Sequence, residues 1–298
     1  GAAWVSVIKD VMMILAVVIV GIGVPVIYFG GFGKMFKVLI EKMPEHIIFP
    51  GAVPSMDVVW VMSTLLLTGL GFYMWPHIFG SAFSAKSDKI IKRNAIIMPL
   101  YQLPILLILM VGFTALLIIP ELKNSDMAFL EIVNKTYPSW FLGFVGAAGA
   151  VTAMVPAAIL VLFGATLLAK NVYQTGFNPK ASDESVMRLS RLMVLFITTV
   201  ALVFALFFPN ELVNLLIFGY DGVCQFFPGV VLGLFWKRAS KWGVFSGLIV
   251  GIGVVVGLII TKNDPFLGLN AGFVGLAANM VVTYVVCLKT QPTKIEGW

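Results

Sequence analysis

Residues 243–261 read GVFSGLIVGIGVVVGLIIT, without a single charged side chain. The hydrocarbon core of a bilayer is about 30 Å thick, and a helix needs about 20 apolar residues to cross it. The composition repeats this signal, because 60% of the 298 residues are hydrophobic, 11% are charged, and the mean hydropathy is +1.01. We therefore predict a multi-pass protein of the cell membrane, with the lipid bilayer as a partner.

Apolar runs of similar length recur along the chain. Lipid offers no hydrogen-bond partner to a bare peptide group, so each run is predicted to be a helix and the fold class to be all-α membrane. We expect about eight transmembrane helices in a single transmembrane domain, 1–298. Because the chain begins at Gly1 and an apolar span follows almost at once, we expect a fragment of a longer protein. The predicted spans are 7–29, 57–79, 95–119, 139–169, 189–208, 211–235, 243–261 and 267–288.

Two connections between the predicted spans are long. Glycine and proline are frequent in 30–56, so we expect little regular structure there. The second connection, 120–138, contains a stretch from Ala128 to Asn134 that is compatible with a short helix at the membrane surface.

The basic residues lie mainly in these and shorter connections. The formal net charge of +6 therefore indicates topology and not a nucleic acid partner. Most of the 20 Lys and Arg residues fall on one side if both termini are cytoplasmic. We predict that orientation, with the 30–56 connection external.

Few side chains suit metal, haem or covalent chemistry. Cys224 and Cys287 lie in apolar segments and form no CxxC pair, which predicts neither a disulfide framework nor a metal site. His46 and His77 are too few for the paired ligands of a multi-haem protein. No nucleophile and base stand together within a span, so we predict no cofactor and no enzymatic activity.

The second span contains Gly69, Gly71 and Pro76 within a short distance. Glycine weakens a helix through backbone entropy, and proline removes a hydrogen bond. We predict that this helix is discontinuous between about Gly69 and Pro76, which would expose backbone groups to a ligand near the membrane midplane. The alternative is a simple proline kink, with His77 hydrogen-bonded into the bundle.

The sixth span contains Gly219-Tyr220-Asp221-Gly222, and Pro228-Gly229 follows. A charged carboxylate at that depth costs about 2.5–3.5 kcal/mol on insertion scales. Asp221 is therefore expected to face a cavity, to hold a partner or to be protonated. The alternative is a structural carboxyl that caps the half-helix after the glycine break.

The fourth span is dense in Gly and Ala, which mainly indicates close helix packing. Pro156 frees the carbonyl of Thr152, about four residues back. That carbonyl is a candidate ligand for a cation, with a neighbouring helix as the alternative partner.

Three stretches of the chain carry a family resemblance. They are Trp75-Pro76-His77 followed by Phe83-Ser84-Ala85-Lys86-Ser87, then Ala169-Lys170-Asn171-Val172-Tyr173, and Pro228-Gly229-Val230-Val231-Leu232-Gly233-Leu234-Phe235-Trp236-Lys237-Arg238 followed by Gly243 and Gly247-Leu248-Ile249-Val250-Gly251. In this order they resemble the sodium:solute symporter family, whose members transport sugars, proline, pantothenate and short monocarboxylates. The resemblance extends over essentially the whole chain, although Val244 stands where the family usually has Ala.

The resemblance implies part of a LeuT-type inverted-repeat bundle in which core helices 1–4 are missing. The spans of this chain would be core helices 5 to 10 and two trailing helices, and each site would be incomplete. Trp75, Pro76 and His77 fall on the substrate-facing stretch of core helix 6. Tyr220 falls on a substrate-lining position of core helix 10, and Asp221 is its neighbour.

The resemblance also implies a departure at the cation site. Sodium-dependent members carry a Ser-Ser or Ser-Thr pair in core helix 8, where hydroxyl oxygens suit a hard cation. Val155 and Pro156 occupy that register here and have no side-chain oxygen. We therefore expect the usual sodium site to be damaged, and a proton carried by Asp221 or His77 to be the substitute.

We predict a secondary active transporter, a cation-coupled symporter of small organic solutes such as monocarboxylates or amino acids, that works by alternating access. Its partners would be a small-molecule solute and a coupling cation, Na⁺ or H⁺. The alternative is an ion-translocating membrane subunit or channel without solute transport. The substrate-binding residues are predicted to be Trp75, Pro76, His77 and Tyr220, and the cation-coupling residues Asp221 and Thr152.

Overall fold

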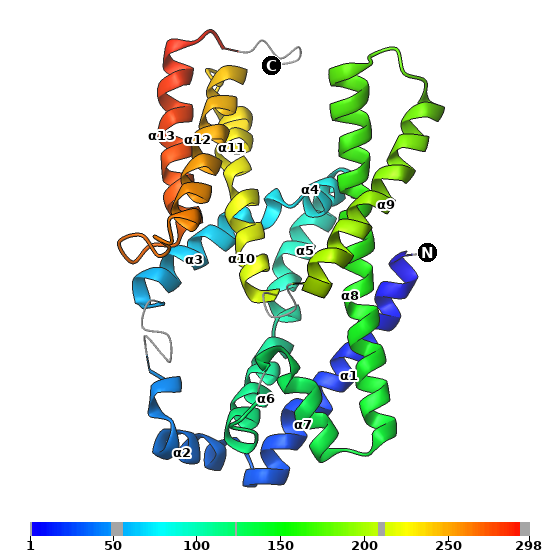
Figure 1. Cartoon of the computed structure of the whole chain (residues 1–298), viewed down its shortest axis with the longest axis vertical. Helices are drawn as coiled ribbons and strands as arrows, with labels where there is room; N and C mark the ends of the chain where they lie inside the picture. Colours follow the sequence, from blue (N-terminus) through cyan, green and yellow to red (C-terminus); the bar gives the residue numbers. More distant parts are fainter. Residues whose placement is uncertain (1, 49–55, 123, 208–211, 293–298) are drawn as a thin grey trace. The chain divides into compact units, whose positions relative to one another are not determined.

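The computed structural model describes residues 2–48, 56–122, 124–207 and 212–292, and its regular elements in these ranges are helices (Figure 1). The predicted all-α membrane class is confirmed, because seven helical stretches there are long and apolar enough to cross a membrane. They are Val5–Phe29, Asp88–Ile118, Ser139–Phe177, Asp183–Phe207, Leu215–Phe235, Lys241–Ile260 and Ala271–Lys289.

The second predicted span, 57–79, is not one helix. It consists of α3 (Val58–Gly71), the short 3-10 helix η2 (Phe72–Met74) and α4 (Pro76–Phe83), with Trp75 in an extended conformation between the last two. The number of uninterrupted spanning helices is therefore smaller than predicted, because this span is broken.

The chain divides into two compact units, and the first comprises Gly1–Pro44 and Ser81–Asn210. Its helices are α1 (Ala2–Phe29), α2 (Phe32–Lys42), α5 (Asp88–Tyr101), α6 (Pro104–Ile118), α7 (Ala128–Thr136), α8 (Ser139–Leu167), the π-helix η4 (Leu168–Phe177) and α9 (Asp183–Phe207). Ala16, Val20 and Val24 recur every four residues on α1 and are buried. This stripe packs in one cluster with buried residues of α6, α7 and α8, among them Val111, Ala115, Ile132, Val133, Phe141 and Val145.

The prediction of little regular structure in 30–56 is wrong for its first part. The chain turns at Gly30 and Gly31, which both have positive φ, and then forms α2. Met35 and Leu39 are buried on one face of α2, while its lysines lie on the exposed face. This amphipathic spacing stabilises a helix despite the flanking glycines. Residues 49–55 of the connection lie outside the described residues, whereas the predicted short helix at Ala128–Asn134 is confirmed as α7.

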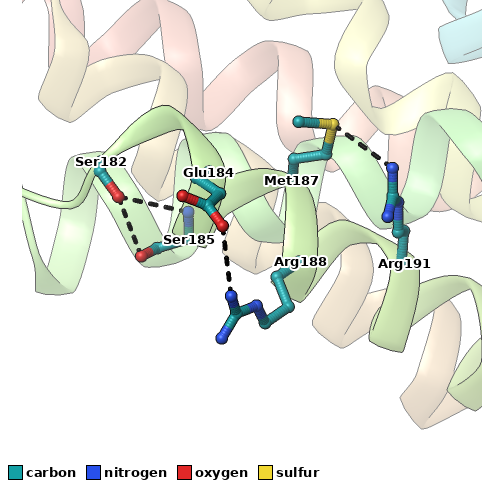
Figure 2. Close-up of polar contacts among 6 residues, drawn as sticks. All are labelled: Ser182, Glu184, Ser185, Met187, Arg188 and Arg191. Carbon is teal, nitrogen blue, oxygen red and sulfur yellow. Dashed lines mark hydrogen bonds and ion pairs between the residues drawn. The ribbon is translucent and has the colours of Figure 1, made fainter.

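Helix α9 begins in a polar cluster (Figure 2). The Ser182 hydroxyl accepts a hydrogen bond from the backbone N–H of Ser185, 3.3 Å away, which satisfies one of the free donors of the first turn. Glu184 forms an ion pair with Arg188 at 3.3 Å, and both side chains are exposed. These contacts extend α9 beyond the apolar run 189–208 by more than a turn.

The second unit comprises Glu45–Gly80 and Glu211–Trp298. It contains α3, η2 and the start of α4, followed by α10 (Leu212–Val223), η5 (Cys224–Phe226), α11 (Phe227–Phe235), α12 (Lys241–Ile260) and α13 (Ala271–Lys289). Helices α12 and α13 lie side by side (Figure 1). Gly243, Gly247 and Gly251 lie one above another on α12 and are buried against α13. That the two units form a single transmembrane domain stays a prediction.

Candidate functional site

The second span is broken where the glycines and the proline predict it. Helix α3 begins after Asp57, whose carboxylate accepts hydrogen bonds from the N–H groups of Val59 and Trp60 at 2.9 and 3.0 Å. It ends at Gly71 and passes through η2 to Trp75, which has φ −60° and ψ 127°. Pro76 then opens α4, at a position where a missing N–H removes no helical hydrogen bond. The predicted discontinuity is confirmed, because Trp75 is extended and not merely kinked.

Trp75 contacts two of the other predicted substrate-binding residues. Its indole meets the ring of Tyr220 edge-on, with the ring centroids 5.4 Å apart, and lies 6.0 Å from the imidazole of His77. Gly219 makes this approach possible, because a Cβ there would lie 3.1 Å from Cη2 of Trp75. The break in the second span therefore places an aromatic pair and a histidine together against α10. Pro76, between Trp75 and His77, sets the direction in which α4 leaves the break.

His77 keeps an unused ring nitrogen. Its Nδ1 is buried and forms no hydrogen bond among the described residues. The alternative prediction, in which His77 is hydrogen-bonded into the bundle, is therefore not confirmed for Nδ1. Such a nitrogen can donate to or accept from a polar solute group, depending on the tautomer of the ring.

The sixth span is also interrupted, at η5 between α10 and α11. The side-chain amide of Gln225 bridges the interruption, because its Nε2 donates to the carbonyls of Asp221 at 3.0 Å and Gly272 at 3.1 Å. Asn279 of α13 in turn donates from Nδ2 to the Gln225 carbonyl at 2.7 Å and accepts from the Thr283 hydroxyl at 3.0 Å. This buried network fixes the backbone on which Asp221 stands.

Asp221 is the most deeply buried acidic residue in this region, with 1% of its surface exposed. It lies against the first turn of α13, where a Cβ on Gly272 would be 2.8 Å from both Cα and Cγ of Asp221. The Oδ1 atom of Asp221 is buried and accepts no hydrogen bond from the part of the chain that the structure describes. This oxygen therefore does not cap α11, and it remains a buried acceptor without a hydrogen bond.

Thr152, the other predicted cation-coupling residue, belongs to the first unit. Helix α8 continues through Pro156, which leaves the Thr152 carbonyl without its usual donor. The Thr152 hydroxyl is also buried without a hydrogen-bond partner in the described ranges. By contrast, the hydroxyls of Thr166 and Thr198 bond to carbonyls four residues back at 2.8 Å. Val155, in the register of the expected hydroxyl pair, is buried.

Sequence reasoning missed the amides Gln225, Asn270 and Asn279. All three are buried, and each lies in or next to an apolar span where a polar side chain requires a partner. Their position in or beside apolar spans could have identified these amides from the sequence. No group of three His, Cys, Asp or Glu side chains suited to a metal occurs within the described residues.

This chain is similar to known membrane transporters. A model of the sodium:solute symporter family matches residues 1–251. The uncharacterized symporter YhjB of Bacillus subtilis (strain 168) is 38% identical over 307 residues, which cover 99% of this chain and 62% of YhjB. A monocarboxylate transport permease protein of Rhizobium johnstonii is 27% identical over 302 residues, which cover 95% of this chain and 60% of that protein. The chain thus spans about three fifths of the length of these curated relatives.

A solved structure shares the fold. The substrate-bound outward-open state of a Na⁺-coupled sialic acid symporter matches 100% of this chain and 64% of that chain, with a TM-score of 0.73 and 17% sequence identity. The predicted fold, part of a LeuT-type bundle, is confirmed by this likeness. At so low an identity the likeness concerns the fold alone.

Proposed function

The chain belongs to the sodium:solute symporter family, and on this premise we propose that it carries part of the site of a cation-coupled symporter for small organic solutes. The family is one of membrane transporters, so the chain is part of a multi-pass transporter of the cell membrane and not of an enzyme. Transport would proceed by alternating access, in which one set of helices rocks against another around a site near the midplane.

The observation that carries the proposal is the break at Trp75. A discontinuous helix in a membrane is tolerated where it is protected by protein or lines a cavity, and such breaks give backbone groups to a ligand. Here the break is flanked by the edge-on pair of Trp75 and Tyr220 and by the unpaired Nδ1 of His77. Aromatic faces suit the carbon skeleton of a solute, and the imidazole suits its polar end.

This combination favours a small solute with one apolar part and one carboxylate, such as a monocarboxylate or an amino acid. A neutral His77 whose proton lies on Nδ1 would donate a hydrogen bond to the carboxylate. A monocarboxylate permease among the relatives supports the same class. Pro76 contributes by fixing the backbone, so that Trp75 and His77 are held at a constant spacing.

The proposed coupling ion is a proton. Val155 and Pro156 offer no side-chain oxygen to sodium, whereas Asp221 is a buried carboxyl whose Oδ1 has no partner among the described residues. Burial favours the neutral form of a carboxyl group, and a solute-induced change in its surroundings can release the proton again. Thr152 is proposed to assist coupling through its freed carbonyl and its unpaired hydroxyl.

The test is uptake of radiolabelled acetate, pyruvate and proline by the full-length transporter in proteoliposomes. We expect concentrative uptake of at least one of these solutes under an imposed ion gradient, and its loss in Trp75→Ala. Trp140→Ala is the matched control, because Trp140 is a tryptophan of α8 that is 72% exposed in the structure. Ion currents without uptake of any organic solute would refute the symporter and favour a channel.

A further inference from the structure

A second carboxyl group lies at the same turn of α13 as Asp221. Asp264, in the connection between α12 and α13, accepts a hydrogen bond at Oδ1 from the N–H of Ala271, 3.1 Å away. The next residue, Gly272, is the one against which Asp221 packs. The two carboxyls thus flank consecutive residues at the start of a 19-residue helix.

The two carboxyls differ in their access to solvent. Asp264 is an exposed residue, whereas Asp221 is 1% exposed. The charge of Asp264 acts on Asp221 electrostatically, so the protonation of one depends on that of the other. Partial burial also raises the pKa of Asp264, and the hydrogen bond from Ala271 opposes part of this shift. Asp264 therefore binds a proton more readily than an ordinary surface aspartate.

At the start of α13, two backbone N–H groups are bonded to side chains other than Asp221. The Asn270 side chain accepts from the N–H of Gly272 at 2.8 Å and caps the helix, and Asp264 holds the N–H of Ala271. The Oδ1 of Asp221 and the Nδ2 of Asn270 are both buried and form no hydrogen bond of good geometry within the described residues, although the Asn270 side chain interacts with the Asp221 carboxyl. A buried carboxylate oxygen that accepts no hydrogen bond of good geometry can bind a proton directly, without any further ligand.

We infer that Asp264 and Asp221 form a proton path at the first turn of α13, in which Asp264 exchanges protons with solvent and passes them to Asp221. The inference rests on the proposed coupling role of Asp221. In each transfer the carboxylic acid of Asp264 loses its proton and becomes a carboxylate, while the carboxylate of Asp221 becomes the acid. Asp264 is then ready to take another proton from water.

A metal cation fits this place less well than a proton. Hard cations need several oxygen ligands, whereas α13 directs N–H groups toward this point and no three-residue metal cluster occurs among the described residues. The positive end of the helix dipole stabilises carboxylates and repels cations. The dipole also opposes protonation of a carboxylate, so what favours a proton here is that it needs no further oxygen ligands.

Within the described ranges, few other titratable groups belong to the elements around the pair. Asp57 lies at the start of α3 near Gly268, and Lys262 stands in the same connection as Asp264. The titratable residues of the two interrupted spans are Tyr73, His77, Tyr220 and Cys224. Those of α12 and α13 lie in the parts of these helices remote from Asp264 and are Lys241, Tyr284, Cys287 and Lys289. Asp264 is thus an exposed acidic group beside the turn of α13 against which Asp221 packs.

The test measures proton-driven solute uptake against external pH in proteoliposomes, together with solute exchange at equal pH on both sides. Asp264→Asn keeps an oxygen for the N–H of Ala271 but cannot carry a proton. We expect it to slow proton-driven uptake on the order of 100-fold and to leave exchange unchanged. Asp264→Glu restores a titratable group and should recover most of the rate. Asp57→Asn, which removes a neighbouring carboxylate that caps α3, is the control and should behave like the parent.

Two results would overturn the path. Uptake by Asp264→Asn that equals the parent at every external pH would show that protons reach Asp221 without Asp264. Equal loss of uptake and exchange in both Asp264→Asn and Asp264→Glu would assign Asp264 a structural role. A parent protein without proton-driven uptake would instead refute the proposed proton coupling, and this outcome is distinguished before any variant is measured.

Discussion

The indole of Trp75 and the ring of Tyr220 meet edge-on, with centroids 5.4 Å apart and planes inclined by 87°. Trp75 stands in the break of one span and Tyr220 in the last turns of α10, close to the interruption of another. The pair therefore joins the two interrupted segments of the second unit. If the two rings line the proposed solute site, a movement of either segment changes the surface that they present there.

This contact predicts energetic coupling between the two residues. Edge-on aromatic pairs contribute about 0.5–1.5 kcal/mol beyond their burial, which corresponds to about 2- to 13-fold in an equilibrium constant. We expect Trp75→Leu and Tyr220→Leu each to raise the KM for solute, and the double variant to raise it by less than the product of the two effects. A double-mutant cycle on KM measures this. Strictly multiplicative effects would mean that the two rings act separately.

The coupling ion gives a second prediction. Sodium should have little effect on uptake, whereas an inward proton gradient should drive it, because we propose that Asp221 carries the charge and Val155 and Pro156 offer no side-chain oxygen. Asp221→Asn should abolish proton-driven accumulation and still permit downhill solute exchange. Uptake is measured with imposed sodium or proton gradients for the parent and the variant. Strict sodium dependence with normal transport by Asp221→Asn would return Asp221 to a structural role.

The Gln225 network predicts a loss of stability. Removing the amide in Gln225→Leu leaves the carbonyls of Asp221 and Gly272 and the Nδ2 of Asn279 with fewer partners in a buried place. Each unsatisfied buried group costs about 1–3 kcal/mol. We expect a lower Tm in detergent, followed by intrinsic fluorescence.

Gln102→Leu is the control for this experiment, because Gln102 is exposed between α5 and α6. An unchanged Tm for Gln225→Leu would mean that the network does not stabilise the interruption at η5.

The sequence predicted the break in the second span but not the amide network at η5 in the sixth span. Gly69, Gly71 and Pro76 are neighbours in the chain, so their combined effect on a helix can be read locally. Gln225 and Asn279 are 54 positions apart, and a single sequence gives no sign that they bond. Asp264 was missed for the same reason, because its relation to Asp221 depends on how the chain returns to the start of α13.

Helix α2 was missed for a different reason. Glycine and proline in 30–56 suggested a loop, and the short run with Met35 and Leu39 on one face was outweighed by this composition. Burial of those two residues decides the structure locally. Composition averaged over a long connection therefore hides a short amphipathic helix.

Topology gives a further prediction. Ser87 and Glu45 are exposed, and the basic residues predict that Ser87 is cytoplasmic and Glu45 external. Both cysteines of this chain are buried, so they give little background labelling. In cells, a membrane-impermeant maleimide should label Glu45→Cys at once and Ser87→Cys only after permeabilisation. Equal labelling of both variants in intact cells would contradict the orientation.

The last prediction concerns the contact of α12 with α13. A Cβ on Gly251 would lie 2.8 Å from Cβ of Asn279 and would also meet the side-chain oxygen of Gln225, whereas a Cβ on Gly253 would meet nothing within 4 Å. Gly251→Ala must therefore push α12 away from α13 or break the Gln225–Asn279 bonds, and overpacking of this kind costs about 1–3 kcal/mol. Gly253→Ala, in the same helix and with the same chemical change, should be neutral or slightly stabilising, because alanine is the better helix former. Thermal unfolding of both variants in detergent separates the steric effect from the change in helix propensity. A Tm of Gly251→Ala equal to that of Gly253→Ala would show that α12 and α13 are not held at the distance seen in the structure.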